Sequence, residues 1–229
     1  MLFVGNSFTF FWNLPKTFQL MGASQQVPIM VRQSTSGGAN WSDHWNGRKG
    51  LRTRELIAAE EWDVVILQDH SQSTYDQRDS FMHYGHLLLP LVQDQGAVPL
   101  LYATWAKANE PEKLPEISEA YQELGQKTGV WVAPVGEMYK QVALKDPGIE
   151  LYDADLKHPS PTGTYLAALV LYRTIIGPVA DIPYRLSTKD ADGEILYMAI
   201  VGQEIAQNIK EVIDAWVVTA AVKKLKDPR

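Results

Sequence analysis

Five short apolar runs, separated by longer amphipathic stretches, are the feature of this sequence that most restricts its fold. The runs lie at residues 2–4, 27–32, 63–67, 97–102 and 130–132. Runs that are nearly continuously apolar are typical of strands covered on both faces, as in a parallel sheet. The stretches between them are too long for hairpins and require crossover connections. The chain is therefore predicted to form an α/β fold around a five-stranded parallel sheet.

Helices are predicted where apolar residues recur at three- and four-residue spacing. The predicted helices span residues 14–21, 42–60, 78–95, 110–128, 162–176 and 192–222. Ser160 is a good N-cap, and Pro161 suits the first helical position after it. One candidate boundary, at residues 181–193, is followed by too little chain for another domain. The chain is therefore predicted to be a single domain over residues 1–229.

Composition and charge exclude several classes of partner. The net charge is -6, and basic residues cluster only at Lys223, Lys224 and Lys226, which argues against nucleic acid or anionic membranes as partners. The chain has no cysteine, so disulfides and thiolate chemistry are excluded. No apolar run approaches the roughly 20 residues of a membrane span. The first strand begins almost at Met1 and no signal peptide is visible. The localisation is therefore not decided: the two alternatives are an exported protein, periplasmic or extracellular, whose leader has been removed, and a cytoplasmic protein.

Small and polar residues follow the predicted strands, at the edge where open parallel sheets bind their ligands. The first strand is followed by Gly5-Asn6-Ser7, and the next three by residues 34–40, 68–72 and 103–105. Glycine enters strained backbone conformations freely, so Gly5 allows a sharp turn that presents the Ser7 hydroxyl at this edge. The alternative is that Ser7 caps a helix. The first interpretation makes Ser7 a candidate nucleophile.

A histidine and an aspartate near the last predicted crossover supply the base that such a serine needs. Asp155 and His158 are three residues apart on a loop that ends at Pro159. At this spacing the carboxylate can accept the Nδ1–H of the imidazole and leave Nε2 free as a base. That base can take the proton of the serine hydroxyl, which is otherwise a weak nucleophile. Asp153 is the alternative orienting residue.

Donors for a developing oxyanion are also available at the strand ends. The backbone N–H groups of Ser7 and Gly38 and the side-chain amide of Gln68 are the candidates. Gly37 is the alternative to Gly38. This chemistry requires neither a metal nor an organic cofactor.

The arrangement resembles the SGNH (GDSL-type) hydrolase superfamily, whose sequence blocks carry Ser, Gly, Asn and His in that order. Gly5-Asn6-Ser7-Phe8 resembles the first block, with Asn6 where many members have Asp, and Gly37-Gly38 resembles the second. Asp155-Leu156-Lys157-His158 matches the Asp-x-x-His block. The blocks span residues 5–158, about two thirds of the chain. The resemblance implies a flavodoxin-like three-layer α/β/α sandwich.

The third block departs from the family pattern. Gln68-Asp69-His70-Ser71 stands where the family usually has Gly-x-Asn-Asp. Some carbohydrate O-acetyl esterases of the superfamily place a Gln in this region, so the resemblance implies Gln68 as the third oxyanion donor. Ser71 and Gln72 are alternatives. The departure favours esterases that act on acylated sugars over lipase-like members.

The sequence thus predicts a serine esterase that removes a small acyl group, most simply acetyl, from a carbohydrate. Trp105, Asn6 and Gly37 are the expected substrate contacts; Trp41 and Trp45 could also stack on a sugar, although tryptophans commonly fill cores. One alternative is a lipase, arylesterase or thioesterase of the same fold. The other is a carbohydrate-binding protein without turnover. The oligomeric state is not indicated.

The remaining histidines point to no second site. His83 and His86, with Asp79, have helical spacing, but such histidines are commonly solvated, and no metal site is predicted. Asp69-His70 and Asp43-His44 are adjacent pairs whose side chains diverge. Neither pair suits a triad.

Overall fold

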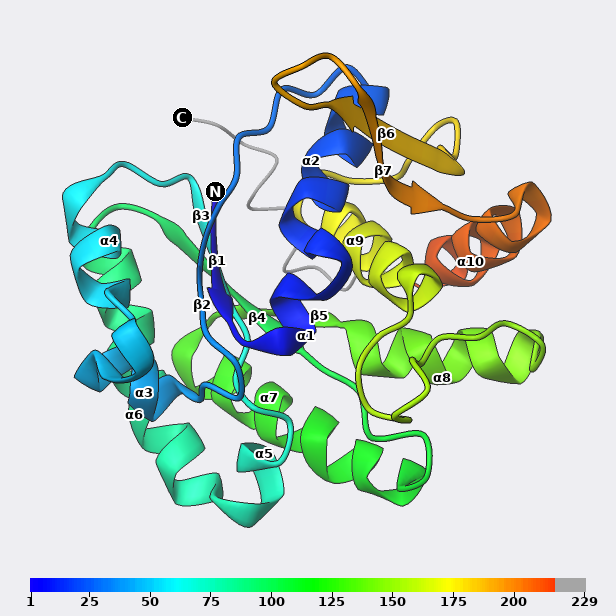
Figure 1. Cartoon of the computed structure of the whole chain (residues 1–229). Coiled ribbons are helices and arrows are strands. Elements are labelled where there is room, and N and C mark those ends of the chain that lie inside the picture. Colours follow the sequence, from blue (N-terminus) through cyan, green and yellow to red (C-terminus); the bar gives the residue numbers. More distant parts are fainter. Residues whose placement is uncertain (217–229) are drawn as a thin grey trace. The chain divides into compact units, whose positions relative to one another are not determined.

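A computed structural model describes residues 1–216 and contains the predicted sheet (Figure 1). Its strands are β1 (Leu2–Gly5), β2 (Arg32–Thr35), β3 (Val64–Leu67), β4 (Val98–Ala103) and β5 (Trp131–Pro134). All neighbouring strands are parallel, in the order β2-β1-β3-β4-β5. This is the flavodoxin-like order. The predicted α/β class with a five-stranded parallel sheet is confirmed.

β1 lies inside the sheet, paired with β2 on one side and β3 on the other. Leu2 is in register with Arg32 of β2 and with Val65 of β3. Leu2, Phe3 and Val4 are all fully buried, although successive strand residues face opposite sides of a sheet. Both faces of β1 are therefore covered, as the continuous apolar run predicts.

The chain divides into two compact units. The first comprises Met1–Phe10 and Val31–Gly136 and includes the whole parallel sheet. The second comprises Phe11–Met30 and the chain from Glu137 onward. The organisation of residues 1–229 as a single domain stays a prediction.

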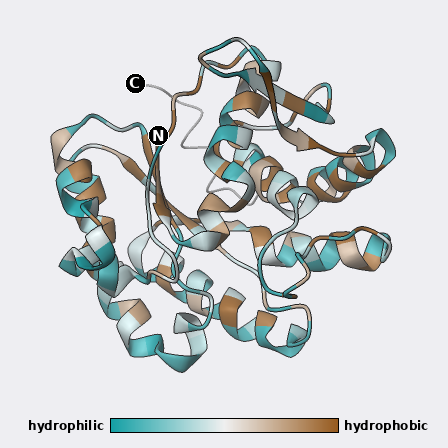
Figure 2. Ribbon diagram, in the orientation of Figure 1, coloured by the Kyte–Doolittle hydropathy of each residue, from teal (hydrophilic) through white to brown (hydrophobic). Residues whose placement is uncertain are grey.

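In the first unit, helices pack on the sheet around one hydrophobic core. The helices are α1 (Ser7–Phe10), α3 (Trp41–Asn46), α4 (Thr53–Ala59), α5 (Ser73–Asp76), α6 (Arg78–Asp94) and α7 (Leu114–Thr128). Trp41 stacks on Phe81 with ring centroids 4.8 Å apart, and Tyr121 meets Trp41 edge-on at 6.1 Å. Figure 2 shows hydrophilic and hydrophobic stretches alternating along α6 and α7, as expected for helices with one buried face.

The second unit is mainly helical. It contains α2 (Leu14–Ser24), α9 (Pro161–Ile175), α10 (Gln203–Ala215) and most of α8 (Val135–Lys145), together with the antiparallel pair β6 (Arg185–Lys189) and β7 (Ile195–Ile200). α9 is almost entirely buried and contacts α2 and α10. The predicted N-cap is confirmed, because the Ser160 hydroxyl accepts the N–H of Gly163 (3.0 Å) ahead of Pro161.

Two predicted elements near the N-terminus are wrong in extent. The strand predicted at 27–32 begins only at Arg32; Met30 is 84% exposed, and Pro28 has no N–H for a ladder. The helix predicted at 42–60 is interrupted, because α3 ends at Gly47 (φ 65°) and a turn of 3₁₀-helix, Arg48–Gly50, precedes α4. The sequence reasoning also missed α8.

The helix predicted at 192–222 is wrong in its first part. Residues 192–200 instead belong to the turn and second strand of the β6–β7 hairpin. The Asp190 carboxylate accepts the N–H groups of Asp192 (3.0 Å) and Glu194 (2.9 Å), and Gly193 has φ 88°. Aspartate and glycine at these positions favour a tight turn over a helix. Helix α10 occupies Gln203–Ala215, and positions 217–222 of the predicted helix lie outside the described residues.

Within residues 1–216, no helix is both long enough and apolar enough to cross a bilayer.

Gly136 is expected to be essential for stability, although glycine within a helix usually weakens it. A Cβ at this position would overlap the carbonyl of Thr104 and lie 2.9 Å from Leu114 Cδ1. We expect Gly136→Ala to lower the free energy of unfolding by about 1–3 kcal/mol, because the backbone must shift. Gly37→Ala is the matched control, because a Cβ at Gly37 has no neighbour within 4 Å. Urea denaturation measures both; equal stability of the two variants would contradict the overlap.

Candidate active site

Ser7 lies at a sharp turn between β1 and α1. Gly5 ends the strand and Ser7 begins the helix, so the turn consists of Asn6 alone. The Asn6 side-chain oxygen accepts the N–H of Phe8 (3.0 Å), and its carbonyl accepts the N–H of Thr9 (2.9 Å). Asn6 is therefore the capping residue, and Ser7 is not. The turn leaves Ser7 half-buried at the carboxyl end of the sheet.

The side chain of Gln68, the residue after β3, is fully buried against this turn. Its oxygen accepts the N–H of Asn6 (2.9 Å) and the hydroxyl of Thr9 (2.8 Å), and its Nε2 donates to the Asp69 carbonyl. A Cβ at Gly5 would overlap the Gln68 oxygen and the Thr9 hydroxyl, so only glycine fits there. These contacts make Gln68 a positioning residue. Its donation to an oxyanion stays a prediction.

Asn6 also joins the turn to the glycine loop after β2. Its Nδ2 donates to the Ala39 carbonyl (2.9 Å), and Ala39 N–H closes a tight turn on the Ser36 carbonyl (3.1 Å). Gly38 is the third residue of that turn and has φ 60°, a conformation that a type II turn requires there and that favours glycine. Gly37 has no such requirement. The oxyanion role of Gly38 and the substrate contacts of Gly37 and Asn6 stay predictions; Asn6 itself is only 2% exposed.

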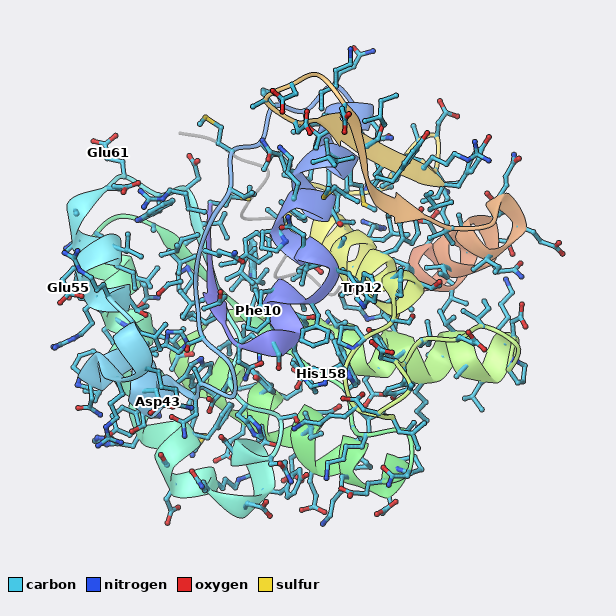
Figure 3. The ribbon with its side chains drawn as sticks, in the orientation of Figure 1. Phe10, Trp12, Asp43, Glu55, Glu61 and His158 are labelled. Carbon is cyan, nitrogen blue, oxygen red and sulfur yellow. The ribbon has the colours of Figure 1, made fainter. Side chains whose placement is uncertain are left out.

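Lys49 holds the carbonyl side of the glycine loop. Its Nζ lies 2.7 Å from the Gly38 carbonyl oxygen and 3.0 Å from a carboxylate oxygen of Asp43. Asp43 in turn shares a capping box with Asn40 at the start of α3 (Figure 3). Sequence reasoning missed Lys49, because a single lysine between two short helices has no periodic or motif signal.

His44 connects the other side of the Ser7 turn to β2. Its Nε2 lies 3.1 Å from the Gly5 carbonyl oxygen, and its Nδ1 lies 2.7 Å from the Thr53 hydroxyl. Thr53 is also bonded to the Ser34 hydroxyl (2.8 Å). The Gly5 carbonyl can only accept, so Nε2 carries a proton. Burial lowers the pKa of His44 to about 4, so the imidazole is neutral at pH 7.

Asp69 performs a similar structural function at the end of β3. Its carboxylate accepts the N–H groups of Trp41 (2.7 Å) and His70 (2.8 Å). The backbone N–H of Asp69 donates to the Tyr121 hydroxyl (3.0 Å). Complete burial raises the pKa of Asp69 to about 7, against the two N–H bonds, which lower it.

Ser71 and Gln72, the alternatives to Gln68, lie in the turn that leads into α5. The Ser71 carbonyl accepts the Thr74 hydroxyl (2.6 Å), and Ser71 is buried while Gln72 is half-buried. These contacts do not select the third oxyanion donor, so both alternatives stay open.

Asp155 and His158 form a couple on a closed loop of the second unit. The imidazole Nδ1 lies 2.5 Å from one Asp155 oxygen, and the other oxygen accepts the N–H groups of Lys157 (3.0 Å) and His158 (2.9 Å). The loop is closed by a bond from the Asp153 N–H to the His158 carbonyl (2.8 Å). Partial burial raises the pKa of Asp155, but the hydrogen bonds from His158 and Lys157 outweigh it and bring the pKa to about 2. The carboxylate is therefore ionised at neutral pH.

The imidazole of His158 is also held by an aromatic residue that the sequence reasoning did not select. The Phe11 ring stacks on it with centroids 4.2 Å apart and planes 10° apart. Trp12, the next residue, donates its indole N–H to the Pro159 carbonyl (2.9 Å). Phe11 and Trp12 lie three and four positions after the end of the Ser7 block, and this proximity to the motif is the only signal that could have identified them.

The tryptophans that were predicted to contact the substrate pack against other side chains of the protein. Trp105 is 1% exposed and stacks on Phe8 at 4.7 Å, while Trp41 belongs to the core. Trp45 is half-buried, with the Arg54 guanidinium over its ring at 5.0 Å. The substrate contact of Trp105 stays a prediction, and its packing gives that role no support.

Among residues 1–216, no three His, Asp or Glu side chains are grouped so that they could hold an ion, and this includes His83, His86 and Asp79.

The predicted site residues thus form two clusters. The first unit gathers the glycine loop and Gln68 around the turn that carries Ser7. The second unit holds Asp155 together with His158. The pairing of Ser7 with His158 stays a prediction.

Comparison with known proteins identifies relatives by structure. Neither a family model nor a curated protein sequence matches the chain. A protein from Slackia heliotrinireducens that is assigned to the SGNH hydrolases is 30% identical, over 76% of this chain and 96% of that one, with a TM-score of 0.62. A DUF4886 family protein from Bacteroides uniformis is 16% identical over 93% and 92% of the two chains, with a TM-score of 0.74. A variant of an acetyl-xylooligosaccharide esterase from Geobacillus, 16% identical over 75% and 91%, shares the fold with a TM-score of 0.60.

The buried neutral His44 is expected to make stability depend on pH. Its pKa is about 4 in the folded protein and 6.5 for an ordinary exposed histidine, so between these values the unfolded chain binds a proton that the folded chain does not. Its contribution to stability is therefore complete above pH 6.5 and declines as the pH falls toward 4. We expect His44→Gln to cost about 1–3 kcal/mol at pH 7 and about 1–2 kcal/mol less at pH 5.

Urea denaturation of both proteins at pH 7 and pH 5 measures this difference. His83→Gln, at an exposed histidine of α6, is the matched control. An equal cost of His44→Gln at the two pH values would contradict a buried neutral imidazole.

Proposed function

Because this chain belongs to the SGNH hydrolase superfamily, we propose that it is a serine esterase that removes an acetyl group from a carbohydrate through an acyl-enzyme. The observation that carries the proposal is the Asp155–His158 couple, in which an ionised carboxylate binds Nδ1 of the imidazole. This bond fixes the tautomer that leaves Nε2 available as a base. Ser7, at the turn after β1, is the nucleophile.

The reaction proceeds in two transfers of the acyl group. The Ser7 oxygen attacks the ester carbonyl while His158 Nε2 takes the hydroxyl proton. The backbone N–H groups of Ser7 and Gly38 stabilise the oxyanion, with Gln68 as the third candidate donor. The imidazolium then gives its proton to the departing sugar oxygen, and the carbon–oxygen bond of the ester breaks. Water, activated by the same histidine, releases acetate and restores Ser7.

Chain connectivity supports the pairing of Ser7 with His158. Phe11 lies four positions after Ser7 in the chain, and it stacks on the His158 imidazole. A fully extended chain spans at most about 3.6 Å per residue, so four residues limit this separation to about 14 Å whatever the arrangement of the two units. The short connection favours a common site for serine and histidine.

The choice of substrate rests on two arguments. The third sequence block, with Gln68 in place of the usual Asn, resembles that of carbohydrate O-acetyl esterases. An acetyl-xylooligosaccharide esterase and an acetyl xylan esterase are among the proteins of the same fold. Both arguments favour an acetylated sugar over a lipid ester.

Removal of the Ser7 hydroxyl is expected to abolish ester hydrolysis. We expect Ser7→Ala to lower kcat by more than about 10³, because no acyl-enzyme can form. Hydrolysis of p-nitrophenyl acetate, butyrate and octanoate and of acetylated xylan measures the loss, and we expect the acetate to be the preferred chromogenic ester. Preference for octanoate would reassign the enzyme to lipid esters. Absence of Ser7-dependent turnover on all four would leave a carbohydrate-binding protein.

The orienting role of Asp155 is tested by an isosteric change. We expect Asp155→Asn to lower kcat by about 10²–10⁴ with a smaller effect on KM, because the amide cannot stabilise the imidazolium or select its tautomer. Asp153→Asn is the matched control, because the Asp153 carboxylate accepts the N–H of the neighbouring Ala154 (2.7 Å). A larger loss of kcat in Asp153→Asn than in Asp155→Asn would show that Asp153, and not Asp155, orients His158.

A further inference from the structure

Trp12 has an unusual backbone conformation for its size. It has φ 49° and ψ 25°, in the left-handed region, and Asn13 after it has φ 52°. Large side chains rarely adopt this conformation. It costs free energy and persists only where surrounding contacts hold the residue in place. The bond from the indole N–H to the Pro159 carbonyl (2.9 Å) is such a contact, and it fixes the orientation of the ring.

The Trp12 ring is nevertheless left open to solvent. It is 48% exposed, and it is the most exposed tryptophan among residues 1–216. Leu156, in the loop that carries His158, is 47% exposed and also has a left-handed backbone (φ 59°). Trp12 and Leu156 are thus two exposed apolar residues with a left-handed backbone, one bonded to the end of the His158 loop and the other within it. Strain of this kind concentrates at functional sites.

The chemistry of the proposed reaction determines what must lie beside His158. The imidazole protonates the departing sugar oxygen, so that oxygen must come within hydrogen-bond distance of Nε2. The Phe11 ring already covers one face of the imidazole (4.2 Å), and Trp12 is bonded to the residue that follows His158. Trp12, which Figure 3 shows near His158, therefore lies where it can meet the ring of the leaving group.

We propose that Trp12 is the stacking platform for the pyranose ring of the alcohol that the reaction releases. The inference rests on the proposed esterase function and names the residue that selects a sugar leaving group. An indole has a large apolar face that suits the C–H face of a pyranose, and its N–H is already used to hold the ring in place. Trp105, which the sequence favoured for this role, is buried.

The test compares a sugar ester with an ester whose alcohol has no ring. The kcat/KM values for an acetylated methyl xyloside and for ethyl acetate are measured for the wild type, Trp12→Ala and Trp12→Phe. We expect Trp12→Ala to lower the ratio of the two values by roughly tenfold, mainly through KM for the sugar ester. Trp12→Phe keeps a ring but loses the bond to Pro159, and we expect an intermediate ratio. Tyr184→Ala removes an exposed aromatic ring that faces Arg185 and should leave both values unchanged.

Two results would overturn the platform. An unchanged ratio in Trp12→Ala would show that the indole does not contact the sugar, and equal losses on both esters would show that it only supports the His158 loop. Both results leave Ser7-dependent hydrolysis, and hence the proposed function, intact.

Failure of the proposed function has a separate signature. If the wild type hydrolyses neither ester, calorimetry with the acetylated methyl xyloside is performed on Ser7→Ala and on Ser7→Ala/Trp12→Ala. A roughly tenfold weaker Kd in the double variant supports the platform in a protein that binds sugars without turnover. An equal Kd in the two variants, or no binding by either, rejects it.

Discussion

The site around Ser7 depends on one buried side-chain oxygen, that of Gln68. It accepts two hydrogen bonds from the Ser7 turn, and so ties the residue after β3 to the residues that follow β1. A buried amide with both ends satisfied is costly to disrupt, because each lost partner leaves a desolvated polar group. The absence of a side chain at Gly5 makes room for this oxygen. The geometry of the turn that carries Ser7 is therefore set by the polar contacts of Gln68 with Asn6 and Thr9.

The sequence predicted the sheet and the Asp155–His158 couple well, because both depend on local signals. Apolar runs mark buried strands, and a spacing of three residues on a loop is enough to join a carboxylate to an imidazole. It predicted the surroundings of Ser7 poorly. His44 and Lys49 reach the Ser7 turn and the Gly38 loop through contacts that only the folded chain creates. Their residue types and spacing resemble those of ordinary surface positions, so no local pattern distinguishes them.

The errors have a common physical origin in backbone conformation. An apolar run at residues 27–32 looked like a strand, but hydrogen bonding to β1 begins only at Arg32. The apparent helix over residues 42–60 is broken at Gly47, and the stretch after Asp190 turns back as a hairpin because of an Asp–Gly turn. In each case a glycine or a register constraint outweighed apolar periodicity, which reports burial but not the path of the chain.

The strand order places β2 at an edge of the parallel sheet, where its outer N–H and C=O groups have no partner strand among the described residues. Its four residues are Arg32, Gln33, Ser34 and Thr35, and the first two are exposed. A short, polar edge with a charge at its start is a poor template for strand addition by another molecule. The residues that shape this edge thus protect the protein against self-association through its sheet, so that variants which make the edge longer or more apolar would be prone to aggregate even with an intact catalytic centre.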